Sequence, residues 1–149
     1  MIKVLFICHG NICRSAMAEC VFTFLAAQAG VSDRFAVDSA AASAEEIGNL
    51  IYPPAARKLR EKGVPVLPHR ARQITRRDYE SFDLIVAMDE YNLRSLRRRL
   101  PDTEGKYRLL LLDYTRRPGE VADPWYTGDF ETAYRDILEG CRGLLAALS

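Results

Sequence analysis

A short apolar segment at residues 3–7 leads directly into a polar loop, and the loop leads into a segment with helical periodicity. The apolar run is continuous rather than alternating, which predicts a strand buried on both faces of a parallel sheet. After Ser15, apolar residues recur on one helical face, and Gly30 suits the end of that helix. Strand, tight loop and helix therefore form one unit, which indicates an α/β fold.

The alternation of strand and helix continues along the chain. The pattern predicts further strands at residues 34–38, 83–88 and 107–112, and further helices at residues 53–62, 90–100 and 130–148. This order implies right-handed crossovers and a doubly wound parallel sheet, whose ligand crevice lies beyond the carboxyl ends of the strands. A chain of 149 residues suits one core, so we expect a single domain over 1–149.

Composition excludes several classes of function. The 21 Lys and Arg residues nearly balance the 20 Asp and Glu residues, so no overall basic field favours nucleic acid as a partner. No stretch reaches the roughly 18 apolar residues of a membrane span, and the first apolar run is too short for a signal peptide. The four cysteines are not needed as disulfides in a chain so rich in apolar residues. We therefore expect a cytoplasmic protein with free thiols.

The loop Cys8-His9-Gly10-Asn11-Ile12-Cys13-Arg14-Ser15 lies between the first predicted strand and the first predicted helix. Its residues must turn back on themselves. Gly10 permits the positive φ angle that such a turn requires, and Asn11 tolerates it better than most residues. Successive amides in such a turn point inward at a helix N-terminus and form a nest for an anion. The loop therefore predicts a phosphate-binding site.

Cys8 and Arg14 add chemistry to this nest. The amides, the helix N-terminus and the guanidinium all favour a thiolate over a thiol at Cys8, and a thiolate is a nucleophile. The planar guanidinium of Arg14 can donate to two phosphate oxygens at once. It can keep both hydrogen bonds as the oxygens move toward the equatorial plane in the transition state. A cysteine at a strand end is more often a small buried apolar residue, but Gly10, Arg14 and Ser15 at these offsets favour catalysis. The loop lacks the lysine of a nucleotide-binding Walker motif, and Cys8 and Cys13 lack zinc-ligand spacing.

An acid for the reaction is predicted in the polar stretch at residues 113–128, which follows the last predicted strand. Phosphoryl transfer from an aryl ester leaves a phenolate, and a carboxylic acid that protonates it accelerates the step. Asp123 precedes Pro124 and is therefore held in an extended conformation, while Trp125 and Tyr126 are suited to flank a phenyl ring. An Asp-Pro pair alone more often begins a turn, but its combination with Cys8 favours the role of general acid.

Four motifs together resemble the low-molecular-weight protein tyrosine phosphatases, and the resemblance extends over the whole chain. They are the loop at 8–15, Ala71-Arg72-Gln73-Ile74-Thr75, Ala87-Met88-Asp89-Glu90-x-Asn92-Leu93, and Asp123-Pro124-Trp125-Tyr126.

The resemblance implies a four-stranded parallel sheet with helices on both faces and a metal-independent phosphatase without a cofactor. Cys8 is then the nucleophile that forms a phosphocysteine, Arg14 binds the phosphate, and Asp123 acts as acid and then as base towards water. We expect a tyrosine-phosphorylated protein as the substrate, inorganic phosphate as a product, and a monomer.

Asn11, Ser15, Ser39 and His69 match family positions that form a polar network under the loop. The resemblance implies that the Ser15 hydroxyl helps the sulfur to leave in the second step. Isolated polar residues such as Ser39 and His69 are more often simply hydrogen-bonded without such a role.

Cys13 also matches a family position, one whose thiol can form a disulfide with the nucleophile under peroxide. Such a disulfide protects a reactive thiolate reversibly. The alternative is a buried loop residue without a redox role, because a reactive thiol must be partly exposed. Cys20 and Cys141 lie on apolar helix faces and are expected in the core.

The chain departs from the family pattern at the mouth of the pocket. By its spacing from Ser39, Glu45 falls where many relatives carry an aromatic or bulky apolar residue, so we expect it beside Trp125 and Tyr126 as a substrate-flanking residue. A solvated loop carboxylate is the alternative.

Two other functions fit part of the pattern. An arsenate reductase uses the same fold and loop but needs a relay of further cysteines, and this chain has none between Cys20 and Cys141. A non-catalytic phosphoprotein-binding module needs Arg14 but neither Cys8 nor Asp123, so the presence of both favours an enzyme.

Overall fold

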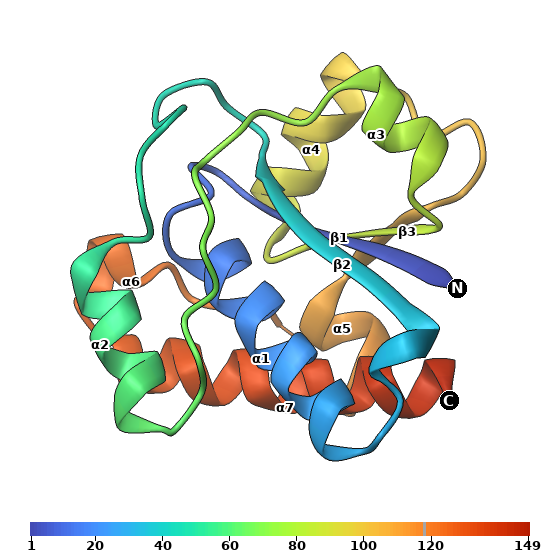
Figure 1. Cartoon of the computed structure of the whole chain (residues 1–149). Coiled ribbons are helices and arrows are strands. Elements are labelled where there is room, and N and C mark those ends of the chain that lie inside the picture. Colours follow the sequence, from blue (N-terminus) through green and yellow to red (C-terminus); the bar gives the residue numbers. More distant parts are fainter. Residues whose placement is uncertain (118) are drawn as a thin grey trace.

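A computed structural model describes residues 1–117 and 119–149 (Figure 1). Its strands are β1 (Ile2–Cys8), β2 (Phe35–Ala41), β3 (Leu84–Ala87) and β4 (Tyr107–Leu109). Its helices are α1 (Arg14–Gln28), α2 (Pro53–Glu61), α3 (Arg76–Ser81), α4 (Glu90–Arg99), α5 (Leu110–Tyr114), α6 (Pro124–Thr127) and α7 (Phe130–Leu148), with a 3₁₀ turn η1 (Ser32–Arg34) before β2. The alternation that the sequence predicts is therefore present.

The four strands form one parallel sheet in the order β2-β1-β3-β4. Strand β1 is central and pairs along its whole length with β2, from Ile2 opposite Phe35 to Cys8 opposite Ala41. Since β2 lies on one side of β1 and β3 on the other, the chain reverses its direction of winding at β1, where ligands bind in sheets of this type. The predicted doubly wound parallel sheet is confirmed.

Helices cover both faces of the sheet (Figure 1). Val4, Phe6 and Cys8 belong to the apolar core shared with α1, α2, α5 and α7. Leu5 and Ile7 belong to the opposite core, shared with α3 and α4. A strand with apolar side chains on both faces has no surface for solvent, which explains the continuous apolar run at residues 3–7.

Helix α1 begins where the loop after β1 ends and is closed by Gly30. The amide of Gly30 donates to the carbonyl of Ala27, the amide of Val31 donates to that of Ala26, and Gly30 has a φ of 72°. This is a Schellman ending, which requires the left-handed conformation that glycine adopts easily. In the part of the chain that the structure describes, no helix is both long and apolar enough to cross a membrane.

The predicted fourth strand is wrong beyond Leu109. The chain bends at Leu110 into helix α5, where the Asp113 carboxylate accepts a hydrogen bond of 2.6 Å from the Leu109 amide. Leu110 packs against Gly140 of α7, and a Cβ atom at Gly140 would lie 2.4 Å from its Cγ. A run of leucines fits a buried strand and a buried helix equally well, so the pattern could not separate the two. The short helices α3 and α6 were not predicted.

Candidate active site

The loop at residues 8–15 begins at the end of the central strand and ends in the first turn of α1. Of the two residues suited to a positive φ angle, Asn11 adopts it, at 61°, and Gly10 does not. A Cβ atom at Gly10 would instead lie 3.1 Å from Cγ of Glu46, so glycine there allows the neighbouring loop to approach closely. Asn11 is one of the residue types that tolerate the left-handed region, and its side chain is used below the loop.

Cys8 lies at the base of this loop and is only 3% exposed. Its Sγ atom is 3.0 Å from the Ser15 Oγ atom and 3.3 Å from the backbone nitrogen of Asn11, which donates to it. Hydrogen-bond donors beside the N-terminal end of a helix stabilise an anionic sulfur. The loop therefore brings the Asn11 amide and the Ser15 hydroxyl within hydrogen-bond distance of the sulfur.

Arg14 is buried beside Cys8 and is held by acceptors on both sides of the pocket. Its Nη1 atom donates to Asp89 Oδ2 at 2.8 Å and to the carbonyl oxygen of Val121 at 2.8 Å. Its Nη2 atom lies 3.4 Å from Asp123 Oδ2. Burial disfavours the charged guanidinium, but Cys8, Asp123 and Asp89 together raise the pKa of Arg14. Arg14 is therefore a fixed cation that joins the two loops of the site.

Asp123 comes from the polar stretch after β4 and caps helix α6. Its Oδ1 atom accepts a hydrogen bond of 3.0 Å from the Trp125 amide, while Oδ2 faces Arg14. The Trp125 ring packs on Tyr52, with ring centroids 4.9 Å apart, and Tyr52 stacks on Phe130 at 6.1 Å. These aromatic contacts hold the segment that contains Asp123 against α7 and the residue before α2.

Both loops line one pocket of about 620 Å³. The residues that line this pocket include the predicted Cys8, Arg14 and Asp123 and the predicted flanking residues Glu45, Trp125 and Tyr126. The lining also includes four residues to which no role was assigned from the sequence, namely Glu46, Asp89, Tyr91 and Asn92. Glu45 Oε2 lies 2.9 Å from His9 Nε2, so its carboxylate is paired across the loop.

The four predicted network residues lie under the loop and contact one another. The Asn11 carboxamide donates through Nδ2 to Ser15 Oγ and to Ser39 Oγ, each at 2.9 Å. Its Oδ1 atom lies 2.7 Å from His69 Nε2 and accepts a further bond of 3.2 Å from the Arg72 amide. Cys8 is therefore connected through Ser15 to a buried polar chain.

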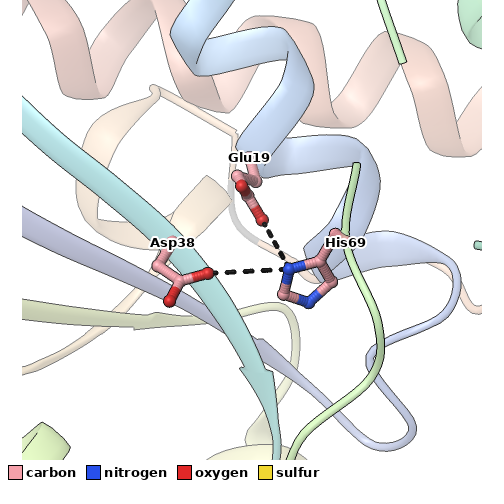
Figure 2. Close-up of side chains that lie close together, drawn as sticks. All are labelled: Glu19, Asp38 and His69. Carbon is pink, nitrogen blue, oxygen red and sulfur yellow. Dashed lines mark ion pairs between the residues drawn. The ribbon is translucent and has the colours of Figure 1, made fainter. Parts of the chain in front are cut away.

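Two carboxylates extend this chain and were not predicted. Glu19 of α1 accepts a hydrogen bond of 2.6 Å from Ser39 Oγ, and Asp38 of β2 accepts one of 3.0 Å from Arg72. Both face Nδ1 of His69, at 3.6 Å from Glu19 and 3.7 Å from Asp38 (Figure 2). The three residues have the donor types of a metal site, but Glu19 and Asp38 are already bonded to Ser39 and Arg72. Their sequence signal is weak, because a glutamate in a helix usually faces solvent.

The other three cysteines are buried. Burial raises the pKa of the Cys13 thiol to about 12 and that of Cys20 to about 11, and it also raises the pKa of Cys141. All three therefore remain protonated thiols at neutral pH. The predicted core positions of Cys20 and Cys141 are confirmed, at 4% and 0% exposure.

Comparison with known proteins gives one consistent result. The family model described as low molecular weight phosphotyrosine protein phosphatase matches residues 3–149. The low molecular weight protein-tyrosine-phosphatase YfkJ of Bacillus subtilis (strain 168) is 41% identical over 150 residues, covering 99% of this chain and 96% of the relative. The human low molecular weight phosphotyrosine protein phosphatase is 42% identical over 151 residues, covering 96% of this chain and 93% of the relative.

Solved structures agree with the sequence matches. The crystal structure of YfkJ superimposes with a TM-score of 0.94 at 40% identity and covers 99% of this chain and 94% of that one. The structure of DARP, a drosophila arginine phosphatase, superimposes with a TM-score of 0.87 at 31% identity and covers 99% of this chain and 98% of that one. With the fold, the family model and the relatives in agreement, the chain belongs to the low molecular weight phosphotyrosine protein phosphatases, a family of cysteine-dependent hydrolases.

Proposed function

We propose that this chain hydrolyses phosphotyrosine in proteins, and small aryl phosphates, through a phosphocysteine on Cys8. The observation that carries the proposal is the placement of Cys8, Arg14 and Asp123 in one pocket, with Arg14 in contact with Asp123. A nucleophile, a phosphate-binding cation and a proton donor are the three groups that phosphoryl transfer from an aryl ester needs.

In the first step the Cys8 thiolate attacks phosphorus and the bond from phosphorus to the phenolic oxygen breaks. Asp123, in its protonated form, donates its proton to that oxygen, so tyrosine leaves as a neutral phenol. The inward-facing loop amides and Arg14 bind the phosphate oxygens as charge spreads over them. Bound phosphate gives Arg14 Nη2 an acceptor in place of Asp123, which frees the carboxyl group to face the leaving oxygen.

In the second step the ionised Asp123 takes a proton from water as the water oxygen attacks the phosphocysteine. The bond between phosphorus and sulfur breaks, inorganic phosphate is released and the Cys8 thiolate returns. The Ser15 hydroxyl lies 3.0 Å from Cys8 Sγ and is placed to donate to the sulfur as its negative charge reappears. The cycle needs no metal and no cofactor.

The pocket wall supports an aryl substrate, since Trp125, Tyr126 and Tyr91 provide apolar faces for a phenyl ring. One observation favours a second candidate: Glu45 and Glu46 line the same pocket, and carboxylates there suit a phosphorylated guanidinium. DARP, which has the same fold, is named an arginine phosphatase. We favour the aryl substrate because Glu45 is already paired with His9.

The rival functions fit the site less well. Arsenate reduction needs a relay of reactive thiols, but Cys20 and Cys141 are buried and burial raises the pKa of both. A module that only binds phosphoproteins does not need a carboxylate opposite the cysteine, whereas Asp123 lines the pocket with Cys8. Both arguments favour turnover.

Hydrolysis of 4-nitrophenyl phosphate and of a phosphotyrosine peptide, with a chelator present, tests the proposal. The wild-type protein should turn over both substrates, and Cys8→Ser should lower kcat by at least about a thousandfold while phosphate-analogue binding persists. Cys20→Ala, a buried thiol on α1, is the matched control and should retain activity. Activity that survives Cys8→Ser contradicts the proposal. Faster hydrolysis of phosphoarginine than of phosphotyrosine would identify phosphoarginine, rather than phosphotyrosine, as the substrate.

A further inference from the structure

The Glu19 carboxylate lies at the far end of the polar chain that begins at Cys8. Glu19 belongs to α1 and is 8% exposed, while its partners come from β2 and from the segment before Ala71 (Figure 2). It does not line the pocket, so it does not touch a substrate. Any effect on the reaction must pass through the residues that connect it to Cys8.

The donors and acceptors of the chain fit together in one direction. The Arg72 amide can only donate, so Oδ1 of Asn11 faces it, and Nδ2 of Asn11 must then donate both to Ser39 and to Ser15. His69 Nε2, which lies 3.3 Å from Ser39 Oγ, must carry a hydrogen because Asn11 Oδ1 at 2.7 Å can only accept. Ser39 therefore accepts from Asn11, and its own hydrogen is left to donate to Glu19 Oε1 at 2.6 Å.

The same direction reaches the nucleophile. Because Ser15 Oγ accepts from Asn11, its hydrogen is free to point at Cys8 Sγ, 3.0 Å away. A carboxylate can only accept, so an ionised Glu19 holds this arrangement in place. A neutral group at position 19 can also donate to Ser39, so that the Ser39 hydroxyl accepts from position 19 instead of donating to it. The direction of the hydrogen bonds from Ser39 to Ser15 is then no longer fixed.

The charge on Glu19 is sensitive to pH in the neutral range. Burial raises its pKa to about 7, against the opposing effect of the Ser39 hydrogen bond. Other charged or titratable groups face it from neighbouring elements, namely Asp38 on β2, and His69 and Arg72 in the segment before α3. In the described residues its nearest basic group is Nδ1 of His69, at 3.6 Å, which forms an ion pair only when the imidazole is protonated, and burial lowers the pKa of His69; no arginine or lysine is bonded to Glu19.

We propose that Glu19 is a positioning residue for catalysis: its carboxylate orients the Ser39, Asn11 and Ser15 chain so that the Ser15 hydroxyl donates to the sulfur of Cys8. This inference rests on the proposed function. Glu19 affects the second step of the reaction, in which the bond between phosphorus and sulfur breaks and the sulfur of Cys8 regains its negative charge.

Two simpler explanations for Glu19 predict different behaviour. A purely structural role affects stability but gives no dependence of turnover on the charge of Glu19. A purely electrostatic effect through space has the opposite sign, because removing a nearby negative charge favours the departing thiolate and accelerates the second step. The chain of hydrogen bonds instead predicts slower turnover when the carboxylate is lost.

The experiment measures kcat for 4-nitrophenyl phosphate from pH 5 to pH 9 in wild type, Glu19→Gln, Ser39→Ala and the double variant. The ratio of wild-type to Glu19→Gln kcat should be near one at pH 5, where Glu19 is protonated, and rise through about pH 7 to about tenfold at pH 8. Titrations common to both proteins, such as that of the general acid, cancel in this ratio. In the Ser39→Ala background, Glu19→Gln should cause no further loss.

Each alternative outcome overturns the inference. A ratio that is flat with pH, that falls below one at pH 8, or that persists in the Ser39→Ala background excludes action through the chain. Where Glu19→Gln fails to fold, Ser39→Ala alone decides, because it must show the same loss at pH 8. An inactive wild-type protein refutes the proposed function itself, whereas active wild-type protein with a flat ratio refutes only the role of Glu19.

Discussion

Replacing Glu19 by glutamine should stabilise the folded protein, and more so at higher pH. Burial raises the pKa of this carboxyl from 4.5 to about 7. Each unit of pKa difference corresponds to about 1.4 kcal/mol of free energy of ionisation. Ionising Glu19 in the folded state therefore costs about 3 kcal/mol more than in the unfolded chain. Glutamine has nearly the same shape, can accept the Ser39 hydrogen bond, and carries no such cost.

The sign follows from the protons that each state binds. Below about pH 4.5 both states hold the proton and Glu19 carries no penalty. Between pH 4.5 and about 7 the folded state keeps a proton that the unfolded chain has lost, so the stability of wild type falls as pH rises. Above pH 7 the penalty is complete. Glu19→Gln should thus gain about 3 kcal/mol relative to wild type between pH 4 and pH 8, or roughly 6–12 °C in Tm.

Urea unfolding at constant ionic strength with a reductant present measures this difference. Titrations of groups far from Glu19 cancel when the variant is compared with wild type at each pH. That of His69, which lies 3.6 Å from Glu19 and whose pKa burial lowers, is coupled to Glu19 and is part of the measured difference. Glu80→Gln, at an exposed position on α3, is the control and should leave the pH dependence unchanged. A difference between wild type and Glu19→Gln that stays constant from pH 4 to pH 8 refutes the reasoning.

Two further predictions concern the acid and the packing of α7. Asp123→Ala should lower kcat/KM more for phenyl phosphate than for 4-nitrophenyl phosphate, because the poorer leaving group depends more on protonation by the acid. Asp33→Ala, which removes an exposed carboxylate, is the control and should change neither value. An equal loss for both substrates would exclude Asp123 as the general acid. Gly143→Ala should lower the free energy of unfolding, measured in urea, by at least about 2 kcal/mol. The new Cβ atom would lie 1.8 Å from the backbone oxygen of Tyr114. A smaller decrease would show that α5 moves aside easily.

The central unit of the fold was predictable because its residues satisfy several requirements at once. Residues 4–7 are all apolar and buried, and the loop after them contains both Cys8, the proposed nucleophile, and Arg14, the proposed phosphate-binding residue. Asp123 was predictable by its position after the last strand, since parallel strands bring their carboxyl ends to the same edge. The roles of the side chains in these segments can be predicted from the local sequence, without knowledge of distant contacts.

The misassigned residues depend on distant contacts. Residues 110–112 are apolar enough for a strand, and only their packing against Gly140 and the bond from Asp113 to the Leu109 amide select a helix. Gly10 and Asn11 were both suited to the positive φ angle, and Asn11 adopts it, while the glycine at position 10 allows Glu46 to approach closely. Neither choice is visible from local spacing.

Glu19 shows the same limit, and it also links stability to function. Its helix position gives no hint of burial, which arises only because β2 and the segment around His69 cover it. A buried carboxylate with no arginine or lysine bonded to it costs free energy that glutamine would avoid. If its only role were to accept the Ser39 hydrogen bond, glutamine would serve better. The two measurements on Glu19→Gln must therefore move in opposite directions at pH 8, with the free energy of unfolding higher and kcat lower. A variant that is both more stable and equally active would remove the reason for a carboxylate at this position.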